Sequence, residues 1–95
     1  MSLRVPNNPL GRAVISSIEH LQANYAEKEF GFSDLPAIPS DLVVEASGLF
    51  GSNAGLEMAQ SSVLTALKDA GLIKSTGPKK FTLTDNGRTA FIVFK

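Results

Sequence analysis

The chain has 95 residues, 43% of them hydrophobic, and no net formal charge, which suits a single domain over residues 1–95 with a modest core. Because it contains no cysteine, disulfides, thiolate nucleophiles and cysteine-ligated zinc are excluded, and we expect a cytoplasmic protein. No apolar run approaches the roughly 18 residues that a membrane span needs, and early prolines interrupt any signal sequence, so we expect neither membrane insertion nor secretion.

The charges are distributed unevenly between the two halves of the chain. Residues 1–50 contain three basic and six acidic side chains, whereas residues 51–95 contain six basic and three acidic ones. A molecule polarised in this way can present a positive face although its total charge is zero. We therefore expect any anionic partner to contact the second half.

The first half begins with a helix and a loop. Asn8 is a typical N-cap and Pro9 a typical first helical residue, and apolar residues then recur every three or four positions, so we expect a helix over residues 9–28. Prolines and a glycine predict a loop over residues 29–39. We expect Phe30, Phe32 and Leu35 to attach this loop to the core.

Two further helices follow. Ser40 predicts the cap of a short helix over residues 41–47, and glycines predict a turn over residues 51–55. A third helix is expected over residues 55–70, with Gly71 at its C′ position. Its predicted core-facing stripe comprises Leu56, Ala59, Val63, Ala66, Leu67 and Ala70, with Leu64 at the flank.

After the third helix the apolar period changes to two, which predicts strands. Residues 72–75 and 80–84 form the expected hairpin, with a turn over residues 76–78. Alternation places Phe81 and Leu83 on the same face, with Thr82 exposed on the other. We therefore expect a two-stranded antiparallel sheet after the helices.

The last segment is ambiguous. Thr84 or Asp85 can cap a helix, and Phe91 to Phe94 fits the end of that helix or a strand, of which we favour the helix. The expected architecture is then α+β: a three-helix bundle, a two-stranded hairpin and a C-terminal helix.

Residues 62–73 and 81–88 resemble the MarR/PadR-like winged helix-turn-helix regulators. In that family the recognition helix has two leucines three apart, here Leu64 and Leu67, and ends in a Gly-Leu-Ile step into the wing. A Leu-Thr-x-x-Gly-Arg segment then opens the next helix. The resemblance implies a winged-helix fold, binding of double-stranded DNA and a role in transcription regulation.

The resemblance places the DNA contacts on the exposed face of the third helix and on the wing. Hydroxyl and ammonium groups there suit phosphates and base edges, and lysines at a hairpin tip suit the phosphate backbone. The expected nucleic-acid-binding residues are Ser61, Ser62, Thr65, Lys68, Lys74, Lys79, Lys80 and Arg88.

A protein-interaction module or adaptor subunit is the alternative. The link over residues 47–55 is longer than the turn of a helix-turn-helix, and the third helix lacks the Arg or Asn that often reads bases. Met58 on that helix is an adaptable apolar contact for a protein partner. Both functions remain open from the sequence.

Catalysis is not expected. The single histidine, His20, has no second histidine or cysteine with which to bind a metal, and the glycine-rich stretch lacks the Lys-Ser/Thr of a P-loop, so we expect no catalytic residue, metal or cofactor. Ile15, Phe91 and Phe94 exceed what a small core needs. They predict a homodimer through the first helix and the C-terminal segment.

Overall fold

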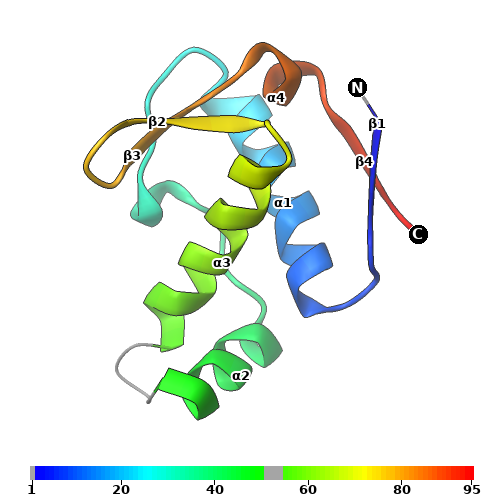
Figure 1. The fold of residues 1–95 in the computed structure, drawn as a ribbon, viewed down its shortest axis with the longest axis vertical. Helices are drawn as coiled ribbons and strands as arrows, with labels where there is room; N and C mark the ends of the chain where they lie inside the picture. The colour runs from blue at the N-terminus through cyan, green and yellow to red at the C-terminus, as the bar shows by residue number, and fades with distance from the viewer. Residues whose placement is uncertain (1, 51–54) are drawn as a thin grey trace.

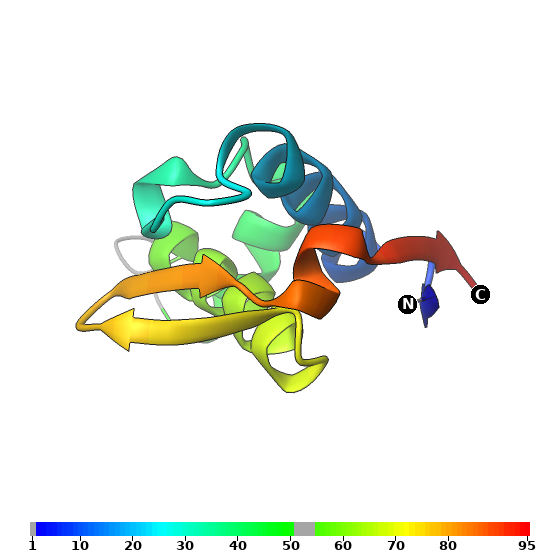
Figure 2. The same ribbon diagram turned by 90° about the horizontal axis from the view of Figure 1, so that it is seen from above.

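The computed structural model describes residues 2–50 and 55–95 and has an α+β architecture. The hairpin and a second, parallel pair of strands lie on opposite sides of the helices (Figures 1 and 2). In chain order the elements are β1 (Ser2–Val5), α1 (Pro9–Asn24), the 3₁₀ helix η1 (Phe32–Asp34), α2 (Ser40–Phe50), α3 (Gly55–Asp69), β2 (Ile73–Gly77), β3 (Lys80–Leu83), α4 (Asp85–Thr89) and β4 (Phe91–Phe94). None of the helices within the described ranges combines the length and apolar character required to cross a bilayer.

Helix α1 starts as predicted and ends earlier. The side chain of Asn8 accepts a hydrogen bond from the Gly11 N–H at 2.8 Å, which confirms the predicted cap. The helix stops at Asn24 rather than residue 28, and the N–H of Tyr25 closes its last turn on the Leu21 carbonyl at 2.7 Å. Helix α2 differs in the opposite sense: it continues to Phe50, past the predicted end at residue 47. The predicted turn over residues 51–55 lies outside the described residues except for Gly55.

Helix α3 ends at the predicted glycine. Gly71 has a φ of +77°, its N–H donates to the Lys68 carbonyl, and the Leu72 N–H donates to the Leu67 carbonyl, as in a Schellman motif. Leu67 is fully buried, but Leu56 is 53% exposed, so its predicted core position is wrong. Helical periodicity predicts the direction of a side chain, and it does not predict how far along the helix the core extends.

The hairpin is confirmed, with a shifted turn. Leu83 lies opposite Ile73 and is buried, and Phe81 lies opposite Ser75 and is half-buried on the same face. Thr82 is half-buried rather than exposed. A bulge extends β2 to Gly77, so the turn falls on Pro78 and Lys79, and Lys79 takes a φ of 56°.

The loop after α1 joins the hairpin through Phe30. Its N–H and carbonyl exchange hydrogen bonds with Phe81 at 2.8 and 2.9 Å, which forms an isolated antiparallel bridge to β3. The Phe30 side chain is 2% exposed, so the predicted attachment of this loop to the core is confirmed.

The C-terminal segment is a strand beyond residue 90, and the predicted helix through Phe94 is wrong. Thr84 caps the short helix α4 by accepting from the Gly87 N–H at 3.0 Å. A Cβ on Gly87 would lie 1.9 Å from the Leu72 carbonyl oxygen, so this turn packs on the chain entering the hairpin. Strand β4 then pairs in parallel with β1. The partner strand β1 lies at the other end of the chain, so the local periodicity of residues 91–94 does not predict this pairing.

Candidate nucleic-acid interface

The exposed face of α3 has short polar side chains along its middle. Ser61, Ser62 and Thr65 border an open groove of about 450 Å³, with Met58 near one end and Asp69 near the other. The Ser62 hydroxyl donates to the Met58 carbonyl at 2.9 Å, so its proton is used within the helix. Within residues 2–50 and 55–95, no hydrogen bond involves the hydroxyls of Ser61 and Thr65, which leaves them available to a ligand.

Ser61 and Thr65 form the ridge of this face. Besides the large groove they border a smaller hollow of about 130 Å³ between α3 and the hairpin, together with Lys68. The far wall of that hollow is aromatic: Phe32 and Phe81 lie with ring centroids 6.4 Å apart. The sequence predicts a core contact for each ring separately but does not predict that they meet, because Phe32 and Phe81 lie 49 positions apart in the chain.

The lysines at the hairpin tip have acidic neighbours. The ammonium group of Lys79 lies 3.8 Å from the Glu57 carboxylate in the first turn of α3, with both side chains largely exposed. On the other side, Lys79 and Lys80 border a polar hollow of about 220 Å³ with Glu29 and Asp34. An exposed ion pair of this kind contributes little stability. A phosphate can therefore replace Glu57 as the partner of Lys79.

The loop carboxylate Asp34 has partners of its own. It accepts from the Tyr25 hydroxyl at 3.0 Å and from the Gly31 N–H at 2.8 Å. The hydrogen bond from the Tyr25 hydroxyl to Asp34, together with partial desolvation and the negative charge of Asp34, raises the pKa of Tyr25 above its usual value of 10.0. Asp34 thus holds the loop that borders the hairpin tip.

Two of the predicted residues lie apart from the α3 face. The guanidinium of Arg88 donates to the Leu83 carbonyl at 3.1 Å and pairs with Asp85, so it stabilises the corner between β3 and α4. Lys74 lies opposite Thr82, and alternation turns both away from the face that bears Leu83. Neither side chain joins the ridge formed by α3.

The predicted residues therefore separate into three groups. Ser61, Ser62, Thr65 and Lys68 share the exposed part of α3, Lys79 and Lys80 lie at the hairpin tip, and Lys74 and Arg88 lie elsewhere on the hairpin and α4. From residue 55 to residue 83 the chain has four lysines and two carboxylates, so this unit is positive. Comparisons with known proteins add no assignment: no family model, curated protein or solved structure matches this chain.

Proposed function

We propose that this protein is a DNA-binding winged-helix regulator of transcription, with α3 in the major groove and the β2–β3 hairpin as the wing. The order of three helices followed by a hairpin supports the fold, as does the bridge from Phe30 to β3. The observation that carries the function is the ridge of α3: Ser61 and Thr65 stand between two hollows, with Lys68 beside them.

Short side chains on a ridge are suited to a groove. B-DNA's major groove is about 12 Å wide and accepts a helix of about 10–12 Å diameter. Serine and threonine keep the helix surface low, so the backbone of α3 can approach the base edges closely. Their hydroxyls donate and accept, and so can contact phosphates or bases, whereas Lys68 supplies a charge for a phosphate.

The wing supplies the second contact. Lys79 and Lys80 are exposed at the hairpin tip, and phosphate contacts there position the protein without reading sequence. Glu57 opposes this contact, because it pairs with Lys79 and repels a phosphate. Removing its charge by Glu57→Gln is therefore expected to raise affinity for random duplex DNA, by up to about fivefold for a pair of this exposure.

A titration of duplex DNA at two or more salt concentrations tests the proposal. The Lys79→Ala/Lys80→Ala variant is expected to bind specific and random duplexes more weakly by a similar factor. The slope of log affinity against log salt should flatten by about two units, because each phosphate contact contributes about −0.9. Arg4→Ala is the control: it removes one positive charge from β1, on the side of the molecule away from the hairpin (Figure 1).

Two results would reject the proposal. One is a parent protein that does not bind duplex DNA at low salt. The other is a double lysine variant whose affinity and salt slope equal those of the parent, which would exclude the hairpin tip as a phosphate contact. Uneven effects of Ser61→Ala or Thr65→Ala across DNA sequences would instead identify α3 as the base-reading element.

A protein-interaction module is the second candidate, favoured by the first turns of α3. Leu56 is 53% exposed there and Met58 lies half-buried at the end of the large groove, next to the acidic Glu57. Apolar groups beside a carboxylate suit a protein surface better than a phosphate backbone. If the protein is such a module, the Lys79→Ala/Lys80→Ala variant should bind the protein partner as the parent does, and Leu56→Ser should bind that partner more weakly.

A further inference from the structure

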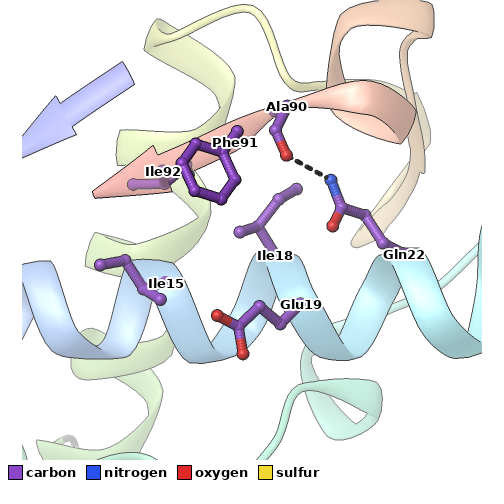
Figure 3. A pocket seen from close by; sticks show the side chains of 7 residues that line it. All are labelled: Ile15, Ile18, Glu19, Gln22, Ala90, Phe91 and Ile92. Carbon is purple, nitrogen blue, oxygen red and sulfur yellow. Dashed lines mark hydrogen bonds between the residues drawn. The ribbon is translucent and has the colours of Figure 1, made fainter. Parts of the chain in front are cut away.

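The parallel pair β1–β4 leaves one edge of β4 open. These two strands form a sheet of their own, separate from the hairpin, and they project from the side of the molecule opposite to it (Figure 2). Beside β4 lies a hollow of about 200 Å³ whose other wall is α1; Ile15, Ile18, Glu19 and Gln22 line it from α1, and Ile18 and Gln22 point toward β4 (Figure 3). Phe91 is 67% exposed at its border.

The hydrogen bonds show which backbone groups of β4 point to this edge. The Lys95 N–H donates to the Val5 carbonyl at 2.8 Å, and Val93 pairs with Arg4. In a parallel ladder alternate residues bond to the same neighbour, so Phe91 and Val93 face β1 as Lys95 does. The N–H and C=O groups of Ile92 and Phe94 therefore point away from β1.

An uncharged edge strand of this composition is a template for another strand. Phe-Ile-Val-Phe has high β-propensity, no proline and no charge, and none of the usual protections of an edge lies within it. The edge is also complementary to itself, because two copies of β4 related by a two-fold axis run antiparallel, as a closed dimer requires.

Of the possible registers between two β4 strands, one pairs the free backbone N–H and C=O groups of Ile92 and Phe94 best. With the two-fold axis at Val93, Ile92 of each copy pairs with Phe94 of the other, and both pairs exchange two hydrogen bonds. The register centred on Ile92 instead requires the Ala90 carbonyl, which already accepts from the Gln22 side chain at 2.9 Å. The register centred on Phe94 forms one bonded pair within β4 instead of two. Val93 is therefore the expected centre.

The favoured register also places opposite charges together. It sets Lys95 of the second copy opposite Phe91, and Phe91 borders the same hollow as the exposed Glu19. The ammonium group can then lie on the phenyl ring, next to a carboxylate. Phe94, 39% exposed in the single chain, comes to lie beside Ile92 of the second copy.

We propose that β4 is a homodimerisation strand: two copies pair through their β4 edges, centred on Val93, into one four-stranded sheet in the order β1-β4-β4-β1. The α3 face and the hairpin lie on the other side of each molecule and stay open (Figure 1). The dimer does not depend on the proposed DNA binding, because its evidence and its test involve no nucleic acid.

Single cysteines test the register, because the chain has no cysteine of its own. Val93→Cys places two thiols at a non-hydrogen-bonded pair, where the Cα atoms are about 4.5 Å apart, within the range of a disulfide. We expect this variant to form a covalent dimer under mild oxidation. Arg4→Cys is the matched control: it is exposed on the neighbouring strand, three strand spacings or about 14 Å from its counterpart, and should stay monomeric on a denaturing gel.

Sedimentation equilibrium supplies an independent readout. The parent is expected to double its mass in the micromolar range. Phe94→Pro removes an N–H that points to the open edge and leaves the β1 ladder intact, so it should sediment as a folded monomer with an unchanged helical circular dichroism signal. A parent that remains monomeric at high concentration would overturn the proposal. So would cross-linking of Arg4→Cys as fast as Val93→Cys, which would indicate another interface.

Discussion

Ser17 in α1 provides the sharpest test of the packing. Its side chain is fully buried in the core, and within residues 2–50 and 55–95 its hydroxyl oxygen has no hydrogen-bond partner. A buried polar group without a partner costs about 1–3 kcal/mol. Ser17→Ala removes that cost and leaves a void of less than a methyl group, so we expect it to stabilise the fold by about 1–2 kcal/mol.

The measurement needs a control for helix propensity, since alanine favours helices more than serine does by a few tenths of a kcal/mol. Ser16→Ala makes the same change at the exposed neighbouring position. For a domain of this size 1 kcal/mol corresponds to about 4–8 °C in Tm, so Ser17→Ala should melt about 4–16 °C above Ser16→Ala. Urea unfolding with equal m-values should give the same difference. If Ser17→Ala were no more stable than Ser16→Ala, the hydroxyl would have a partner and the inferred packing around α1 would be wrong.

Three further predictions concern substitutions at single positions. Leu67→Ala should destabilise by about 2–5 kcal/mol, whereas Leu56→Ala should change stability by less than about 0.5 kcal/mol; equal melting of the two would contradict the orientation of α3. Gly71→Ala should cost about 1–2 kcal/mol, because a Cβ there meets no atom within 4 Å and only the left-handed φ opposes it; a neutral effect in urea unfolding would contradict this backbone conformation. Asp34→Asn should lower the raised pKa of Tyr25, the only tyrosine, in an ultraviolet titration, and an unchanged pKa would exclude their hydrogen bond. Since folding raises this pKa, the stability from the pair is present below about pH 10 and is lost as the pH rises through the folded-state pKa.

Local signals explain which elements could be predicted. The caps at Asn8 and Thr84 and the glycine at position 71 act within a few residues of the chain. Asn8 and Gly71 have the predicted roles, and of the two candidate caps Thr84 and Asp85 the structure uses Thr84. The hairpin follows from alternation at Phe81 and Leu83. These interactions join residues that are close in the sequence, so local sequence patterns predict them.

The errors have a common cause in distant contacts. Phe91 to Phe94 fits a helix or a strand locally, and the pairing with β1 decides for the strand; no local pattern in residues 2–5 predicts β1. The site shows the same limit. Glu57 does not belong to the predicted core-facing stripe of α3, but its approach to Lys79 depends on how the hairpin folds back over the helix.

The pairing of β1 with β4 also has a consequence for the order in which the protein folds and opens. It closes a loop of almost the whole chain, and each doubling of loop length costs about 0.6 kcal/mol, so this closure costs about 2 kcal/mol more than a loop of about ten residues. The two strands should therefore dock last and separate first. Their amide protons should exchange with solvent faster than those of α3, through openings that leave the core intact. In such an opening β4 is exposed on both edges, so a β1 strand from another molecule can replace its own, and strand exchange between chains becomes a route to larger assemblies at high concentration.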